Sequence, residues 1–261
     1  MPTSPLLKVT LIQTSLVWED INANLHRFNQ LLGTIPKNST DLVILPEMFS
    51  TGFTMNAKLL GESQQGKTVS FLKEHSKKLN ATLTGSHIVK EDTNYYNRLQ
   101  WVTPNGKIKS YNKRHLFRMA KEEKTYTPGK EKLSVTLNGW KICPLICYDL
   151  RFPVWCRNKE KYDLLIFIAN WPEKRSSHWK LLLQARAVEN QCYVIGVNRV
   201  GEDGNKIYYS GDSMLVDPKG EELFHSSHEE IIKTITLDKN FITGYRNTFP
   251  AFRDADNFDI R

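Results

Sequence analysis

The amino-acid sequence predicts one α/β domain. Segments with the composition of strands alternate with segments of helical spacing through most of the 261 residues. Two runs, residues 141–147 and 163–170, are almost entirely apolar, which is typical of strands covered on both faces. No repeat, low-complexity stretch or linker divides the chain, so we expect a single domain over residues 1–261.

The first predicted elements are a strand, a helix and a short strand. Residues 7–14 are rich in β-branched side chains, as expected of a strand. Residues 20–33 carry apolar side chains at helical spacing, and Gly33 closes the pattern. Residues 41–47 form a short apolar run, in which Pro46 ends the predicted strand.

A second helix and a set of strands follow. Residues 67–80 have their apolar side chains on one side of a predicted helix, and residues 81–89 have the composition of a strand. A Pro-Asn-Gly turn within residues 98–113 predicts a hairpin. The helical pattern and the strand pattern thus continue to alternate.

The clearest helix lies in the second half, at residues 177–191. We expect Ser177 to cap it and an apolar stripe that includes Trp179 and Val188 to face the core. Residues 192–201 then predict a strand.

The remaining elements are strands and an irregular tail. Residues 206–226 predict a hairpin that turns at residues 217–220, and residues 230–238 predict the last strand. Residues 241–261 show little regularity. We expect them to pack as a C-terminal arm, and disorder is the alternative for such a tail.

Composition and charge narrow the class of protein. Hydrophobic residues make up 40% of the chain and charged residues 25%, which is ordinary for a soluble globular protein. The net charge of +8 permits contact with nucleic acid, but no recognisable binding motif accompanies it, so we expect no nucleic-acid partner. No run approaches the roughly 20 apolar residues that span a bilayer, and no signal-peptide pattern is visible. We therefore expect a cytoplasmic protein without a membrane partner.

The four cysteines are not spaced as metal ligands. Cys143, Cys147, Cys156 and Cys192 form no Cys-x-x-Cys pair, and no histidine or cysteine stands at zinc-finger spacing. We expect no metal, and thiols that stay reduced in the cytoplasm.

Two charged residues directly follow predicted strands. Glu47 comes after an apolar run, so burial would make its carboxylate a usable base near neutrality. The alternative is a helix cap or a salt-bridged surface acid. Lys113 ends a predicted strand, where its ammonium could stabilise a thiolate and a developing oxyanion. The alternative is a lysine on a solvated loop.

Cys147 is the candidate nucleophile. Free cysteine is often a buried packing residue. Here, however, the thiol stands at the tip of an apolar strand and is followed by a polar turn, which is the arrangement of a nucleophile elbow. Cys143, inside the same run, is the better candidate for packing, and we assign Cys156 and Cys192 to structure as well.

Several motifs together resemble the carbon–nitrogen hydrolase, or nitrilase, superfamily. They are "LVILPEMFSTGF", "SYNKRHLF" and "ICYDLRFP", which carry Glu47, Lys113 and Cys147, with further similarity in "RAVENQCYVIGVNRVG" and "GDSMLVDPKGE". A second glutamate of the family matches Glu122 in "EEKTYTPGKE", although the adjacent Glu123 is an alternative. The resemblance implies a four-layer α-β-β-α sandwich in a single domain.

The resemblance also implies the chemistry. Glu47 would take the proton of Cys147, whose thiolate attacks an amide carbonyl, while Lys113 and the backbone N–H of Tyr148 stabilise the oxyanion. Water would then hydrolyse the thioester, again with Glu47 as base. Glu122 would position Lys113 or the substrate, and no cofactor or metal is needed.

A finer resemblance points to the substrate. The segments "ANWPEKRSSHW" and "YRNTFPAFRDADNF" are similar to those of the bacterial omega-amidase, or 2-oxoglutaramate amidase, branch. Members of that branch hydrolyse the terminal amide of 2-oxoglutaramate and 2-oxosuccinamate to a 2-oxo dicarboxylate and ammonia. The resemblance therefore implies an omega-amidase.

Five residues are candidates for substrate binding. An anionic substrate needs a cation outside the triad, and Arg175 or Arg118 could bind its carboxylate bidentately. Both could instead be solvated loop residues. We expect Phe53, Tyr148 and Trp171 to form the walls of the pocket, since Trp171 follows a strand that ends beside that of Cys147.

Other functions are consistent with parts of the sequence. A related amidase for N-carbamoyl compounds, aliphatic amides or deaminated glutathione would share the triad. A Cys-His dyad with His115 or His178 is disfavoured, because Glu47 and Lys113 already fill the necessary roles. A non-catalytic nucleic-acid-binding protein and an inactive interaction subunit are the alternatives of other classes. The resemblance further implies a homodimer, paired through the helix after the cysteine motif and the C-terminal tail.

Overall fold

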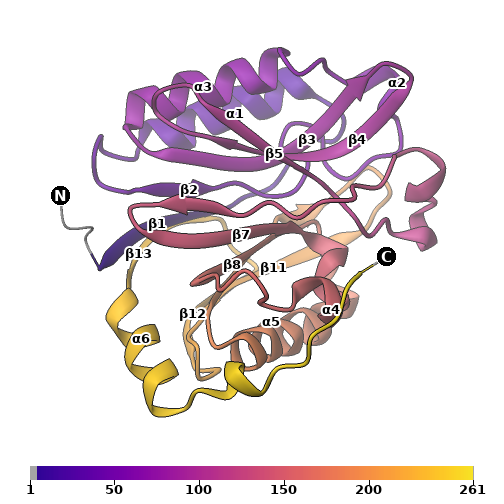
Figure 1. Ribbon diagram of the computed structural model, residues 1–261. Helices are drawn as coiled ribbons and strands as arrows, with labels where there is room; N and C mark the ends of the chain where they lie inside the picture. The colour runs from indigo at the N-terminus through magenta and orange to yellow at the C-terminus, as the bar shows by residue number, and fades with distance from the viewer. Residues whose placement is uncertain (1–4, 261) are drawn as a thin grey trace.

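The computed structural model describes residues 5–260. Residues 1–4 and 261, which belong to the domain and the arm expected from the sequence, lie outside the described residues. Two β-sheets face each other, and helices cover the outer face of each (Figure 1). The expected four-layer sandwich is therefore confirmed.

The first sheet contains strands from the N-terminal half and one strand from the far end of the chain. Its strand order is β13-β1-β2-β3-β4-β5. Strands β1, β2 and β3 are parallel, whereas β13, β4 and β5 add antiparallel edges. The strands are β1 (Leu6–Gln13), β2 (Leu42–Ile44), β3 (Thr82–Glu91), β4 (Asn94–Val102), β5 (Ile108–Asn112) and β13 (Ile231–Asp238).

The second sheet is built around three parallel strands. Its order is β10-β11-β9-β8-β7-β6, and β12 pairs with β11. Strands β7, β8 and β9 are parallel, so their carboxyl ends meet at one edge. The strands are β6 (Val135–Leu137), β7 (Trp140–Ile146), β8 (Leu164–Ile168), β9 (Tyr193–Val197), β10 (Val200–Glu202), β11 (Tyr208–Val216) and β12 (Glu222–Ser227).

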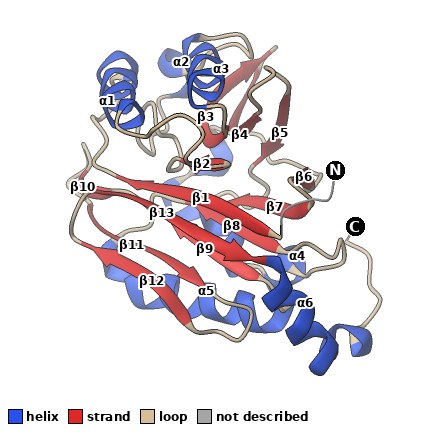
Figure 2. Cartoon of the chain, turned by 90° about the vertical axis from the view of Figure 1, so that its left-hand side faces the viewer, coloured by secondary structure: helices blue, strands red, loops and turns tan. Residues whose placement is uncertain are grey.

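Helices form the two outer layers (Figures 1 and 2). Helices α1 and α3 cover the first sheet and α5 covers the second. The helices are α1 (Ile21–Gly33), α2 (Ala57–Leu60), α3 (Lys67–Leu79), α4 (Pro153–Cys156), α5 (Ser176–Asn190) and α6 (Lys239–Thr248). In the described part of the chain, no helix has the length and apolar composition needed to cross a membrane.

The main core lies between the sheets and beneath α5. Leu11 and Ile44 of the first sheet belong to the same buried cluster as Ile166 of the second and Trp179 of α5. A separate cluster, which includes Phe28, packs α1 and α3 on the other face of the first sheet. Burial on both faces explains why β7 and β8 are nearly all apolar in sequence.

Several sequence predictions need correction. Helix α5 begins at Ser176, so Ser177 is not its cap, and Val188 is 49% exposed instead of facing the core. The predicted strand at 192–201 is divided into β9 and β10. The tail is also more regular than expected, because the side chain of Asp238 accepts a hydrogen bond from the backbone of Asn240 and starts α6.

Candidate active site

The ends of three strands bring the predicted reactive groups together. Glu47 stands three residues after β2, Lys113 directly follows β5, and Cys147 directly follows β7. The first two come from one sheet and the third from the other, so the site lies where the two sheets meet. All three side chains are at least nine-tenths buried.

Glu47 is held by donors from three segments. Its Oε1 accepts hydrogen bonds from Lys113 Nζ at 2.9 Å and from Asn97 Nδ2 at 2.8 Å. Its Oε2 accepts the backbone N–H of Asn170 at 2.8 Å. The side chain of Asn170 also donates to the backbone carbonyl of Glu47 at 2.6 Å. These donors satisfy both carboxylate oxygens of a fully buried side chain, where an oxygen without a partner would be costly.

Lys113 bridges two carboxylates. Its Nζ lies 2.9 Å from Glu47 Oε1 and 3.0 Å from each carboxylate oxygen of Glu122. Burial alone would lower the pKa of Lys113, but the charges of Glu122 and Glu47 outweigh it and raise this pKa above its ordinary value. The ammonium therefore keeps its charge throughout the physiological range.

The second glutamate of the site is Glu122. It is fully buried, whereas Glu123 is exposed. Besides holding Lys113, it accepts the backbone N–H of Phe117. Burial and the nearby Glu47 raise the pKa of Glu122, while Lys113 opposes the shift. Of the two adjacent glutamates, the structure thus joins Glu122 to the site.

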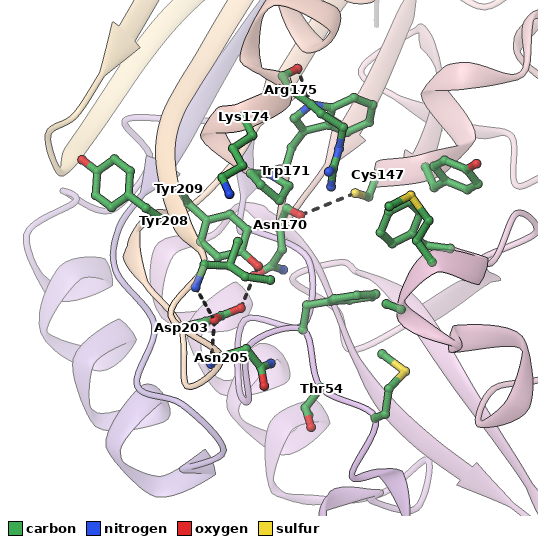
Figure 3. Close-up of a pocket in the computed structure, with 18 of the residues that line it drawn as sticks. Thr54, Cys147, Asn170, Trp171, Lys174, Arg175, Asp203, Asn205, Tyr208 and Tyr209 are labelled. Atoms are coloured by element: carbon green, nitrogen blue, oxygen red, sulfur yellow. Dashed lines mark hydrogen bonds between the residues drawn. The ribbon is translucent and has the colours of Figure 1, made fainter.

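Cys147 occupies a strained turn. Its φ angle is +43°, in the left-handed region that non-glycine residues rarely adopt. Its Sγ lies 3.9 Å from the backbone carbonyl oxygen of Asn170 (Figure 3). Burial and the Glu47 carboxylate raise the pKa of Cys147, and Lys113 only partly offsets this. The thiol is therefore protonated at rest and needs a base when it attacks.

Asp149 connects the turn that begins at Cys147, the cysteine turn, with the loop that begins at Lys113, the lysine loop. One of its carboxylate oxygens accepts two hydrogen bonds from His115, one from the backbone N–H at 3.0 Å and one from the ring Nδ1 at 2.8 Å. The other accepts the hydroxyl of Tyr111 at 2.7 Å and the backbone N–H of Ile146 at 3.1 Å. Since these partners flank Lys113 and Cys147, Asp149 fixes the distance between the two reactive groups.

A cavity of about 1000 Å³ opens beside Cys147 (Figure 3). Lys113 and Cys147 line one part of it, together with the expected wall residues Phe53, Tyr148 and Trp171. The parallel pairing of β7 with β8 places Trp171 beside Cys147, as the sequence predicts. The expectation of an aromatic wall therefore agrees with the geometry.

Two arginines face this cavity. Arg175 lines it as expected, and Arg151 lines it as well. Burial and the positive charge of Arg175 lower the pKa of Arg151. Neither forms an ion pair with a carboxylate within residues 5–260. By contrast, Arg118 is exposed and is not part of the lining, so the structure does not support it as a carboxylate-binding residue.

Neither candidate histidine contacts the thiol. His115 is engaged by Asp149, and its ring stacks on Phe152 with the centroids 3.8 Å apart. The Nδ1 of His178 lies 3.1 Å from a guanidinium nitrogen of Arg151. Both rings are thus engaged by residues other than Cys147.

Four residues of the site were missed from the sequence. Asp149 and Arg151 stand inside the cysteine motif "ICYDLRFP", so their position in that motif was an available signal. Asn97 lies within β4 and Asn170 two residues beyond β8, where nothing in the local pattern marks them. Only the three-dimensional arrangement of the two sheets reveals their contacts with Glu47.

Comparison with known proteins agrees with this geometry. The family model of the carbon-nitrogen hydrolases matches residues 8–247. The chain belongs to the carbon–nitrogen hydrolase family. It is therefore a hydrolase of carbon–nitrogen bonds in amides, and relatives named omega-amidase and 2-oxoglutaramate amidase confirm its expected place in the omega-amidase branch of the nitrilase superfamily.

Individual relatives cover nearly the whole chain. Omega-amidase YafV of Escherichia coli K12 is 44% identical over 98% of this chain and 99% of its own length. The 2-oxoglutaramate amidase of Bacillus subtilis is 35% identical over 82% of this chain and 84% of its own. The structure of XC1258 from Xanthomonas campestris, a CN-hydrolase superfamily protein with an arsenic adduct in its active site, superposes with a TM-score of 0.96. It is 41% identical and covers 98% of this chain and 99% of that one.

Proposed function

We propose that the protein is an omega-amidase that hydrolyses the terminal amide of 2-oxo acid amides such as 2-oxoglutaramate and 2-oxosuccinamate. The observation that carries the proposal is that a cavity is lined by the buried thiol of Cys147, by the ammonium of Lys113, which binds the Glu47 carboxylate, and by two arginines. The thiol, carboxylate and ammonium are the groups needed for nucleophilic attack on an amide carbonyl, and the arginines can bind a substrate carboxylate. Relatives named omega-amidase and 2-oxoglutaramate amidase support this assignment.

The first half of the reaction forms a thioester. Glu47 takes the proton from Cys147 as the sulfur attacks the amide carbonyl carbon. The Lys113 ammonium and the backbone N–H of Tyr148 stabilise the oxyanion, and one such donor contributes about 2.7–4 kcal/mol. The tetrahedral intermediate then collapses: its C–N bond breaks, and Glu47 returns the proton to the departing ammonia.

The second half hydrolyses the thioester. Glu47 takes a proton from water, whose oxygen attacks the thioester carbonyl. The C–S bond then breaks, and the thiolate of Cys147 regains a proton from Glu47. Throughout the cycle, Glu122 holds the Lys113 ammonium beside the reacting oxygen.

Arg151 and Arg175 select an anionic acyl group. Both residues line the same cavity, where the positive charge of Arg175 lowers the pKa of Arg151 and a bound carboxylate would pair with the guanidinium groups. Arg175 is held in place from the other side, because the indole N–H of Trp171 donates to its backbone carbonyl at 2.7 Å. We therefore expect the pair to recognise the carboxylate of the 2-oxo acid.

The proposal is tested by measuring ammonia released from a panel of amides. We expect turnover of 2-oxoglutaramate and 2-oxosuccinamate to exceed that of N-carbamoyl amino acids and of neutral aliphatic amides. A preference for the N-carbamoyl compounds or the neutral amides would reject the proposed substrate class.

Variants of the arginines test how the substrate is bound. We expect Arg151→Met and Arg175→Met each to raise KM for 2-oxoglutaramate by roughly 10- to 100-fold, because each removes a charge-assisted hydrogen bond. Hydrolysis of a neutral amide should change far less. Arg118→Met is the matched control and should leave both substrates unaffected.

We further propose a cytoplasmic homodimer. All four cysteines are free thiols in the structure, which suits a reducing compartment.

Helix α5 is apolar on both faces: Trp179 and Leu183 are buried under the sheet, whereas Leu181 and Val188 are 65% and 49% exposed. Exposed aliphatic side chains that recur on one helix face support a contact with a second copy of the chain.

A further inference from the structure

We propose that Asn97 is a positioning residue that holds the Glu47 carboxylate in the orientation in which it accepts the proton of Cys147. This inference rests on the proposed mechanism, in which Glu47 is the base. It concerns a residue of β4 that the sequence pattern does not distinguish from the structural residues around it.

Asn97 links the base to the lysine loop. Its Nδ2 donates to Glu47 Oε1 at 2.8 Å, and its backbone carbonyl accepts the N–H of Lys113 at 2.9 Å. Lys113 Nζ in turn donates to the same oxygen of Glu47. One residue therefore fixes both the carboxylate and the backbone from which the ammonium extends.

The Asn97 side chain has no other partner that would justify a polar group here. It is 1% exposed, and its amide oxygen has no hydrogen-bond partner in the described structure. A buried carbonyl that lacks a partner is unfavourable, and an apolar side chain of similar size would avoid that cost. The bond to Glu47 is thus the one interaction of the side chain that favours asparagine.

Asn97 acts through Glu47 and not on the substrate. It is absent from the residues that line the cavity, whereas Asn170, the other asparagine beside Glu47, does line it. A change at Asn97 should therefore alter kcat while KM stays nearly constant. This separation distinguishes positioning from substrate binding.

Two substitutions test the inference by different physical routes. Asn97→Leu removes the donor and should lower kcat by about 10- to 100-fold, with KM within about twofold of wild type. Asn97→Asp keeps the size but puts a second carboxyl next to Glu47. The two carboxyls should share a proton near neutrality, so the acidic limb of the kcat/KM profile should move up by about one pH unit or more.

The other ionisable groups near Glu47 are the same in the wild type and in Asn97→Asp. They are Lys113, Glu122, Cys147 and Tyr126, none of which the substitution changes. Asn190→Asp is the matched control: Asn190 is buried in α5, its Nδ2 also donates to a glutamate, Glu189, and it does not line the cavity. Its profile should coincide with that of wild type.

The experiment measures kcat, KM and their pH dependence with 2-oxoglutaramate. Active protein is counted from the burst of p-nitrophenolate that p-nitrophenyl acetate releases. If both Asn97 variants keep the wild-type kcat per active site and the wild-type acidic limb, the inference is overturned, even if they melt at a lower temperature. If Asn97→Leu does not fold, Asn97→Asp decides the question alone.

The proposed function and this inference can fail separately. If the wild-type protein shows the burst but releases no ammonia from 2-oxoglutaramate, the substrate assignment fails. The pH dependence of the burst rate in Asn97→Asp then still tests the inference, because acylation by the ester also needs Glu47. A shifted acidic limb supports the inference, and an unshifted one rejects it.

Discussion

Lys113 determines the balance of charge within the site. Its ammonium is 1% exposed and pairs with two fully buried carboxylates, those of Glu47 and Glu122. Each of the three charges is costly to bury alone, so the group is stable only as a set. The same ammonium is the proposed oxyanion donor, which makes catalysis and stability depend on one side chain.

Replacing Lys113 should therefore impair both properties. We expect Lys113→Met to reduce turnover below detection and to lower the free energy of unfolding by roughly 3–5 kcal/mol at neutral pH, because it leaves two buried carboxylates unpaired. Chemical denaturation and the ammonia assay measure the two effects. Lys113→Met combined with Glu122→Gln should recover part of the stability and none of the activity.

The pH dependence of stability follows from the raised pKa of Lys113. A lysine whose folded pKa lies above its unfolded value stabilises the fold fully below the unfolded pKa, and loses this contribution as the pH rises through the folded pKa. We expect the stability gap between wild type and Lys113→Met to be at least as large at about pH 10 as at about pH 7, because the unpaired buried carboxyls of the variant lose protons over this range, and to narrow at higher pH. Urea denaturation at a series of pH values measures the gap. A gap that closes below pH 9 would contradict the ion-pair network.

At the scale of the elements, three strand ends and the loops after them form the site. The apolar runs of β2, β7 and β8 are readable in the sequence because both faces of each strand are buried, and so Glu47 and Cys147 could be predicted as residues at strand ends. The partners of Glu47 could not be predicted, because Asn97 lies in β4, two strands away from β2, and Asn170 follows a strand of the other sheet, at sequence separations of 50 and 123 residues.

Helix α5 shows that the local sequence pattern does not determine where a helix starts or which of its faces is buried. The start of α5 was misjudged by one residue, since the hydroxyl of Ser176 donates to Asp212 of β11, a contact that no local rule anticipates. Val188 fits the expected stripe by spacing, yet it lies on the exposed face. A helix that is apolar on both faces gives no period from which the buried side can be chosen.

Asp149 should control the spacing between the lysine loop and the cysteine turn. We expect Asp149→Asn to lower kcat by roughly 10- to 100-fold and the free energy of unfolding by about 1–3 kcal/mol, because the amide cannot accept all four hydrogen bonds. Asp217→Asn is the control, since Asp217 accepts two backbone N–H groups in a remote turn. It should lose stability while kcat stays unchanged; equal losses of kcat in both variants would contradict the specific role of Asp149.

For the molecule as a whole, we predict that the exposed face of α5 forms the interface of the proposed dimer. Leu181 is 65% exposed on a helix whose opposite face packs against the second sheet. We expect Leu181→Glu to give a monomer by light scattering at micromolar concentration, because a charge would be buried in the interface. Leu59→Glu, at a residue that is 75% exposed on α2, should leave the mass unchanged. A wild-type monomer would reject the dimer.

Acid-quenched mass spectrometry of the intact protein tests the proposed chemistry most directly. After mixing with 2-oxoglutaramate, the wild-type chain should gain the mass of one 2-oxoglutaryl group, mapped to Cys147, while Cys147→Ala should gain nothing and release no ammonia. Ammonia release by the Cys147→Ala variant at the wild-type rate, or an acyl group on a different residue, would contradict the mechanism.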